Sequence, residues 1–322
     1  KNVPKKIFNA IRTSFKNKQV TALYFEANER NKSQKNINKI IEILLKKNFS
    51  RQDCLIAVGG GITGDLAGFI ASIFKRGLQF VNIPTTLLAQ VDSAIGGKTG
   101  INSIYGKNLI GTFYQPKLVI SDTIFLKSLP RREIICGYGE ILKHSLISDK
   151  KFFNFLNKNV LKILDLKEPH IQKAIYQSCK IKKKVVEEDE KESGLRKILN
   201  FGHTFAHAYE ASLGFSKKLN HGEAVLLGIK TAIKFSLENK FLKIKDYRLI
   251  LSHFDKAKLS FRIQDYFSKR DLNKLISFMN EDKKNTNSGI NLILLNKIGL
   301  TYYDIIFSQH KIKFFLKKQL IN

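Results

Sequence analysis

The sequence contains no tryptophan and few sulfur-containing residues. Of its 322 residues, three are cysteine and one is methionine. Because Cys54, Cys136 and Cys179 are odd in number and far apart, the pattern argues against a disulfide framework or a zinc site built from cysteine. Such cysteine usage suits a reducing compartment, so we expect a cytoplasmic protein.

Long hydrophobic runs are absent as well. No apolar run reaches the ~18 residues that a transmembrane helix needs, so we expect no membrane span. The first residues, KNVPKKIFNAIRTSFKNK, lack the apolar core of a signal peptide. With 43% hydrophobic and 26% charged residues, the composition is that of a globular protein, and the length suffices for two domains.

Acidic residues are scarce compared with basic ones. The chain has 27 of the former and 56 of the latter, for a formal net charge of +29. A basic face that binds nucleic acid would explain this charge. The alternative is compositional drift, because the basic residues are mostly lysines scattered among asparagine, isoleucine and phenylalanine. No recognition module of aromatic and arginine residues occurs, so we favour drift, with part of the charge serving an anionic substrate, and expect no nucleic-acid partner.

The first part of the chain alternates between short apolar segments and helical patterns. Residues 33–47 place apolar side chains on one face of a helix. Apolar runs typical of strands occur at TALYF (21–25), CLIAV (54–58), FVNIP (80–84) and KLVIS (117–121). This alternation predicts an α/β nucleotide-binding domain over residues 1–129, with a mainly parallel sheet and helices on both sides.

From residue 130 onward the pattern becomes helical. Helices are expected at 131–147, from Pro169 to about 187, and in the segments that begin at His203 and His221, with Asn220 as an N-cap. Near the end, NLILLNKIGLTYY predicts a small hairpin. We therefore expect a mostly α-helical C-terminal domain over residues 130–322, with a boundary that rests only on this change of period.

A glycine loop, GGGITGD (59–65), follows the strand at 54–58 and precedes an apolar helix. Glycines let backbone N–H groups approach a pyrophosphate, and the N-terminus of a helix favours its negative charge. The spacing is not G-x-G-x-x-G, and a tight turn between strand and helix would explain the same residues. On spacing alone, both interpretations stay open.

Polar residues gather after the next strand. Thr85 and Thr86 end the strand at 80–84, where their hydroxyls can reach a cofactor. Four further residues lie among glycines and are predicted on loops: Asp92, Lys98, Lys107 and Asn108. Loops at strand ends bind ligands in α/β proteins, although most lysines there are simply solvated.

The helical part contains a candidate metal site. Glu140 and Lys143 share a face of the helix at 131–147, His203 and His207 share a face of the next, and His221 opens a third. Two histidines and a carboxylate make a catalytic zinc site with an open fourth position. A lone helical histidine is usually structural. Spacing alone does not select the carboxylate among Glu140, Glu210 and Glu223.

Further side chains are candidates for binding an anion: Lys182, Arg196, Asn200, Lys283 and Lys284. Taken singly, each is more often a solvated polar group. Arg196 and Asn200 are four residues apart and lead directly into the segment that begins at His203, which favours a joint role.

These motifs, in this order, resemble the 3-dehydroquinate synthase family of sugar-phosphate cyclases. The runs GGGITGDLAGFIASIFKRG, FVNIPTTLLAQVDSAIGGKTGIN and GKNLIGTFYQP are similar to the family's nucleotide domain. The runs GYGEILKHSLI, GLRKILNFGHTFAHAYE and NHGEAVLLG are similar to its helical domain. The resemblance covers roughly residues 24–300, and it is specific because the motifs are long and ordered.

The resemblance implies roles for individual residues. The ligands of a zinc or cobalt ion would be Glu140, His203 and His221. The NAD contacts would be Glu29, Lys32, Gly60, Gly61, Gly64, Asp65, Thr85, Thr86 and Lys107. The substrate contacts would be Asp92, Lys98, Asn108, Lys143, Lys182, Arg196, Asn200, His207 and one of Lys283 and Lys284, of which we name Lys284. Arg76 would reach the site of the second subunit in a homodimer.

The same resemblance implies an enzyme, a phosphate-eliminating carbon–oxygen lyase. It would convert a sugar-acid phosphate, 3-deoxy-arabino-heptulosonate 7-phosphate, to 3-dehydroquinate and phosphate in the shikimate pathway of aromatic amino-acid biosynthesis. NAD would accept a hydride and return it after phosphate elimination, and an intramolecular aldol step would close the ring. A substrate with a phosphate and a carboxylate would explain the many cations.

The start of the chain departs from the family's pattern. The family normally begins with a further strand and an aspartate that holds the adenosine ribose, and no aspartate precedes Glu29. We therefore expect either a fragment or a reduced first domain.

Four alternatives stay open at this point. One is a degraded, inactive copy, against which the intact set of site residues argues. Another sugar-phosphate cyclase would share the fold and the cofactors, although Arg196 and the other basic residues favour a keto-acid substrate. A metal-dependent polyol dehydrogenase would release NADH. A basic nucleic-acid-binding protein, from a different class, would leave the set of histidines and glutamate unexplained.

Overall fold

The computed structural model describes residues 3–281 and 289–321. The chain divides into two compact units, Lys1–Ile134 and Ile135–Asn322. The predicted assignment of a nucleotide-binding domain to residues 1–129 and a metal-binding domain to residues 130–322 stays a prediction.

The first unit contains a parallel sheet. Its strands are β1 (Cys54–Gly59), β2 (Gln79–Pro84) and β5 (Leu118–Val119), in the order β1-β2-β5. Both pairs are parallel, and the register sets Gly59 opposite Pro84. The predicted strands at 54–58 and 80–84 are confirmed, and the one at 117–121 is present as the shorter β5.

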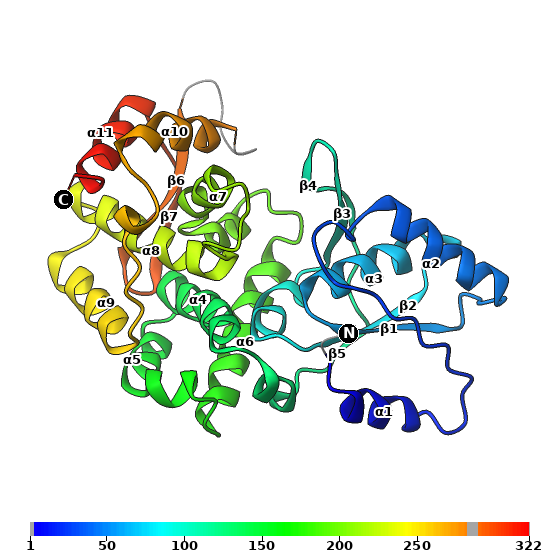
Figure 1. Ribbon diagram of the computed structural model, residues 1–322. Helices are drawn as coiled ribbons and strands as arrows, with labels where there is room; N and C mark the ends of the chain where they lie inside the picture. The colour runs from blue at the N-terminus through cyan, green and yellow to red at the C-terminus, as the bar shows by residue number, and fades with distance from the viewer. Residues whose placement is uncertain (1–2, 282–288, 322) are drawn as a thin grey trace. The chain divides into compact units, whose positions relative to one another are not determined.

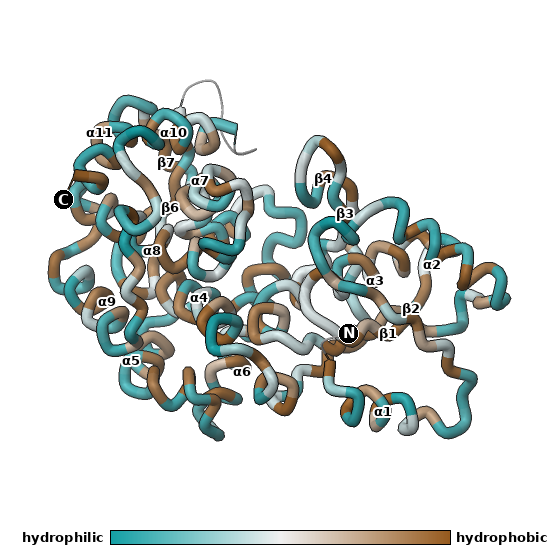
Figure 2. Tube along the Cα trace, in the orientation of Figure 1, coloured by the Kyte–Doolittle hydropathy of each residue, from teal (hydrophilic) through white to brown (hydrophobic). Residues whose placement is uncertain are grey.

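Helices α1 (Lys5–Thr13), α2 (Gln34–Lys46) and α3 (Gly61–Ile73) belong to the same unit (Figure 1). Helix α3 packs against β1 and β2 and is mostly hydrophobic, as its brown colour in Figure 2 shows. Ile37 from α2, Ile70 from α3 and Phe80 from β2 are buried in one core cluster. Three short helical turns complete the unit: Phe74–Arg76, the π-helical Ala89–Ser93, and Thr123–Ser128.

The strand predicted at residues 21–25 is wrong. This segment has no regular secondary structure, and its apolar side chains Leu23 and Tyr24 are exposed. A strand needs a neighbour whose backbone completes its hydrogen bonds, and an apolar run alone does not supply one.

The loops predicted around Asp92, Lys98, Lys107 and Asn108 are also wrong. Asp92 lies on the π-helical turn Ala89–Ser93. The other three lie on an antiparallel ribbon of β3 (Lys98–Ser103) and β4 (Gly106–Phe113). Gly100 and Gly111 face each other across the ribbon, and a Cβ added to Gly111 would lie 2.0 Å from the carbonyl oxygen of Thr99. The glycines that suggested loops therefore permit a close approach of two strands.

The second unit is mostly helical and confirms the predicted fold class. Its strands β6 (Ile290–Lys297) and β7 (Leu300–Phe307) form the predicted antiparallel hairpin. Two 3-10 turns, Ile263–Asp265 and Lys269–Asp271, and a 3-10 segment, Leu195–Asn200, join the helices. The helices are α4 (Arg131–Ser148), α5 (Lys150–Leu164), α6 (His170–Glu188), α7 (His203–Ser212), α8 (His221–Glu238), α9 (Ile244–Lys256), α10 (Leu272–Asn280) and α11 (Gln309–Gln319).

Membrane spans were sought in the described residues. Among these, no helix combines the length and the apolar character that crossing a membrane requires.

A buried histidine lies in the core of the second unit. His253 is fully buried on α9, where its Nε2 lies 2.8 Å from the Tyr138 hydroxyl and its Nδ1 lies 3.3 Å from Asn157 Oδ1. Burial, with a smaller contribution from the nearby Lys256 charge, lowers the pKa of His253 to about 4. The folded state therefore holds this imidazole neutral at pH values where an exposed histidine is already protonated.

This burial predicts a loss of stability at mildly acid pH. The unfolded chain takes up the His253 proton near pH 6.5 and the folded chain only near pH 4, so the free energy of unfolding should fall between these values. The fall should be on the order of 3 kcal/mol and level off below pH 4. Urea unfolding at several pH values should show that His253→Gln reduces this slope, whereas His310→Gln, at an exposed position, does not. An unchanged slope in His253→Gln would contradict the assignment.

Candidate active site

The carboxyl edge of the parallel sheet carries the glycine loop. β1 ends at Gly59, Gly60 is the N-cap of α3, and no side chain caps this helix. The N–H of Thr85 donates to the carbonyl of Gly59 over 2.9 Å, so Thr85 and Thr86 lie at the same edge. Ligands of parallel α/β sheets bind at this edge, and an uncapped helix N-terminus presents N–H groups to a phosphate. Gly61 and Gly64 belong to the first turn of α3.

A buried lysine connects this helix to the ribbon. Lys32 is only 4% exposed, and its Nζ lies 2.5 Å from Asp65 Oδ2 on α3. The same Nζ donates to Asn108 Oδ1 on β4, where Asn108 has a left-handed φ of 55°. Burial raises the pKa of Asp65, and the Lys32 charge opposes this shift. Three predicted site residues, assigned separately to NAD and to substrate, thus form one network.

Glu29 adds two contacts to the same region. Its Oε1 lies 3.4 Å from Lys107 Nζ, and its Oε2 accepts a hydrogen bond of 2.7 Å from Asn102 Nδ2. The structure therefore brings Glu29 and Lys107 together. Asn102 was not among the predicted residues, and only its place at the end of the run GGKTGIN pointed to it.

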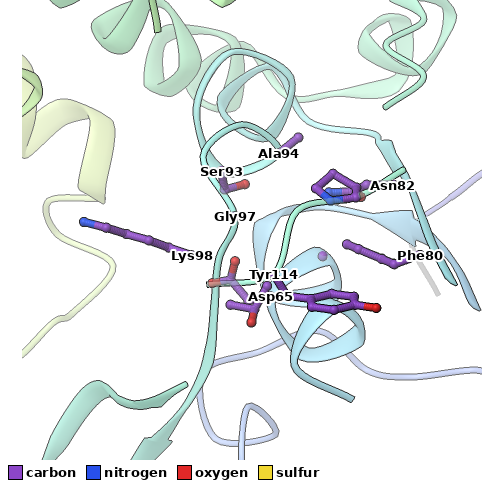
Figure 3. A pocket seen from close by; sticks show the side chains of 11 residues that line it. Asp65, Phe80, Asn82, Ser93, Ala94, Gly97, Lys98 and Tyr114 are labelled. Atoms are coloured by element: carbon purple, nitrogen blue, oxygen red, sulfur yellow. The ribbon is translucent and has the colours of Figure 1, made fainter. Parts of the chain in front are cut away.

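The other predicted residues of the first unit lie in three places. Asp92 is on the π-helical turn Ala89–Ser93, and Arg76 is exposed on a turn with a φ of 64°. Lys98 lines one pocket together with Gly64 and Asp65, and its side chain extends away from Asp65 and Tyr114 (Figure 3). Lys98 is an exposed residue at the start of the ribbon.

The cluster in the second unit consists of Glu140 on α4 and the first residues of two further helices, His203 on α7 and His221 on α8. One ligand atom from each lies within 4.8 Å of those of the others. Glu140 is fully buried; its Oε2 is paired with Lys143, whereas its Oε1 accepts no hydrogen bond from the described residues. His203 Nε2 lies 3.6 Å from Glu140 Oε1, close to the ~3.4 Å expected between two ligands of one zinc ion. The residues therefore fit a divalent metal.

Close packing of two helices creates this cluster. A Cβ added to Gly222 on α8 would lie 2.2 Å from Cys136 Cα on α4, so the two backbones touch. Glu140 lies one turn beyond Cys136, and His221 precedes Gly222. The predicted N-cap is confirmed: Asn220 Oδ1 accepts from Glu223 N, and Glu223 Oε2 accepts from Asn220 N. The carboxylate of Glu223 is therefore part of the capping box of α8.

The other predicted site residues of this unit lie on several different elements and have different partners. Lys143 is buried and forms an ion pair with Glu140, and Lys182 is buried on α6. Arg196 donates to the carbonyl of Glu190, and Asn200 donates to the Glu192 carboxylate. His207 is exposed, with its ring centre 5.3 Å from that of His203. Lys284 lies outside the described residues.

Asp189 organises the loop that carries Arg196 and was not predicted. Its carboxylate accepts from the backbone N–H groups of Gly194, Arg196 and Ser193. These hydrogen bonds, the one from Gly194 first, lower the pKa of Asp189 to about 2. No sequence motif indicated Asp189, because its role depends on how the backbone turns at Ser193–Arg196, four to seven residues further along the chain.

Comparisons with known proteins agree with this architecture. Family models described as 3-dehydroquinate synthase N-terminal and C-terminal match residues 22–136 and 137–285. The 3-dehydroquinate synthase of Pelagibacter ubique (strain HTCC1062) is 62% identical over 320 residues, which cover 99% of this chain and 87% of that protein. The 3-dehydroquinate synthase of Alkaliphilus metalliredigens (strain QYMF) is 44% identical over 266 residues, covering 83% and 73%.

A solved structure shares the fold. It is that of 2-deoxy-scyllo-inosose synthase complexed with carbaglucose-6-phosphate, NAD+ and Co2+, which is 26% identical to this chain. The TM-score is 0.88, with 98% of this chain and 88% of that chain covered. The α/β unit, the helical unit and this likeness define the class as that of the sugar-phosphate cyclases. Within that class, because the family models match both units, the chain belongs to the 3-dehydroquinate synthase family.

The Lys32 network predicts a clear effect on stability. In Lys32→Met, Asp65 keeps its burial but loses its partner, so the free energy of unfolding at pH 7 should fall by about 3 kcal/mol. Adding Asp65→Asn should recover much of this loss, since no charge is then left unpaired. Urea unfolding measures both. Lys107→Met breaks the more exposed pair with Glu29 and should cost less than about 1 kcal/mol. Equal losses for the two lysines would contradict this account.

Proposed function

We propose that this chain is a 3-dehydroquinate synthase that converts 3-deoxy-arabino-heptulosonate 7-phosphate to 3-dehydroquinate and phosphate, using NAD and a divalent metal, zinc or cobalt. The observation that carries the proposal is the set of Glu140, His203 and His221. It occurs in a chain that is 62% identical to a 3-dehydroquinate synthase over 99% of its length. Membership in the shikimate pathway follows from this reaction.

The metal and the nucleotide supply complementary chemistry. When bound, the metal would polarise the hydroxyl that is oxidised, and NAD would serve as a hydride acceptor that is regenerated in the same turnover. Glu140, His203 and His221 would hold the metal. The buried Oε1 of Glu140, which accepts no hydrogen bond within the described residues, supports this role.

The chain's cations would neutralise and orient the substrate. A phosphate and a carboxylate on one molecule call for several cations, and the guanidinium of Arg196 offers two parallel donors to such a group. The exposed imidazole of His207, close to His203, suits a contact with the phosphate. The proposed substrate contacts are Asp92, Lys98, Asn108, Lys143, Lys182, Arg196, Asn200, His207 and Lys284.

The first unit would bind the nucleotide. The uncapped N-terminus of α3 supports a pyrophosphate contact at Gly60, Gly61 and Gly64. Thr85 and Thr86 lie at the same edge of the sheet and would line the cofactor site. Lys32 and Asp65 would act as a pair, because the two side chains form an ion pair with each other. The pair of Glu29 and Lys107 supports a further contact at the ribbon.

We also propose a cytoplasmic homodimer. The exposed position of Arg76 leaves its side chain accessible to a second subunit. None of the three cysteines, all within the described residues, forms a disulfide, which suits a reducing compartment.

A coupled assay tests the proposed reaction. Purified protein should release phosphate from the heptulosonate phosphate only when both NAD and metal are present, without net formation of NADH. His203→Ala should lower the rate at least about 100-fold, because a metal ligand supports several kcal/mol of transition-state stabilisation. Lys245→Ala, at an exposed position on α9 that is distant in sequence from every proposed ligand, serves as the control.

The alternatives give different results in the same assay. A polyol dehydrogenase would accumulate NADH and release no phosphate. Another cyclase would be inactive with this substrate and active with the phosphate of a sugar that carries no carboxylate. Phosphate release that persists after complete removal of the metal would contradict the proposal.

A further inference from the structure

The imidazole ring of His221 contacts the carboxylate of Glu210 through its Nδ1 atom. Its Nδ1 lies 3.0 Å from Oε2 of Glu210. The two residues come from different helices, His221 from the first position of α8 and Glu210 from α7. The Glu210 side chain is only 12% exposed, so its charge is poorly screened by solvent.

The second histidine of the cluster is held differently. His203 Nδ1 lies 3.3 Å from the backbone carbonyl oxygen of Phe201, and its Nε2 faces Glu140. Both histidines therefore have an oxygen acceptor at Nδ1. The acceptor of His203 is a neutral carbonyl, while that of His221 is a carboxylate.

An acceptor at Nδ1 decides which nitrogen can bind a metal. A neutral imidazole carries one N–H, and an oxygen acceptor draws that proton to the nitrogen it contacts. With the proton on Nδ1, the lone pair of Nε2 is available to a cation. A carboxylate acceptor also raises the basicity of the ring, and such outer contacts typically change metal affinity 10–100-fold.

We propose that Glu210 is a positioning residue for the metal, which fixes His221 with Nδ1 protonated and Nε2 directed to the ion. The inference rests on the proposed metal site of Glu140, His203 and His221. Glu210 is not itself one of the ligands, because its carboxylate is engaged by His221. Its role differs from that of Glu223, whose carboxylate closes the capping box of α8.

Metal affinity tests this role without relying on activity. Metal-free full-length protein is titrated with zinc in competition with a chromophoric chelator, for the wild type, Glu210→Ala and Glu210→Gln. Glu210→Ala should bind zinc 10–100-fold more weakly, on the order seen when outer contacts of metal sites are removed. Glu210→Gln keeps an acceptor for the N–H but loses the charge, so its affinity should lie between the other two.

A double substitution tests whether Glu210 acts through His221. His221→Ala should weaken zinc binding strongly, and adding Glu210→Ala to it should cause no further loss. Additive losses would overturn the proposal, because Glu210 would then act on the metal independently of His221. The visible spectrum of the Co2+ form should also change in Glu210→Ala, since the ligand field depends on the orientation of His221.

The controls separate the possible failures. Glu187→Gln is a matched change on α6, where Glu187 is exposed and forms an ion pair with Lys183, and it should leave zinc affinity unchanged. Circular dichroism of the metal-free variants shows whether they fold. If Glu210→Ala is unfolded, Glu210→Gln, whose side chain has nearly the same shape as that of glutamate, still tests the role of the charge. Unaltered zinc affinity in both Glu210 variants would refute the positioning role. Wild-type protein that binds no zinc would instead refute the metal site on which it rests.

Discussion

The backbone contact between α4 and α8 is the constraint on which the candidate metal site depends. The N–H of Gly222 donates to Cys136 Sγ over 3.2 Å, and any side chain at position 222 would overlap the backbone of α4. Glu140 and His221 flank this crossing, so the distance between a buried carboxylate and an imidazole is set by helix packing. Helix α7 is joined to α8 by a buried hydrogen bond of 2.9 Å between Tyr209 and Thr231, which holds the third member, His203, in the same unit.

Charge is handled differently in the two units. In the first, Lys32 is buried with both Asp65 and Asn108, so a cation that could contact a ligand also stabilises the protein. In the second, Glu140 is buried beside two histidines; its Oε2 is paired with Lys143, and its Oε1 receives no hydrogen bond from the described residues. Buried charges are costly without compensation, and such a site gains stability when a cation binds.

Local patterns in the sequence predicted the features that depend on neighbouring residues. The helix with Glu140 and Lys143 on one face, the Asn220 cap and the terminal hairpin all follow from short spacings, and the structure confirms them. Interactions between distant residues were not predictable in this way. Lys32 and Asp65 are 33 residues apart, and the ribbon of β3 and β4 looked like loops because glycines also permit close strands. Glu210 was only one of three candidate carboxylates until folding placed it beside His221.

The most direct test of the metal site is a crystal structure of the zinc-loaded protein, with anomalous scattering measured at the zinc edge. The account predicts a single strong peak bound by Glu140 and by the Nε2 atoms of His203 and His221, at distances of about 2.0–2.2 Å. It also predicts that Glu210 remains hydrogen-bonded to His221 Nδ1. A peak on other residues, or coordination through His221 Nδ1, would contradict it.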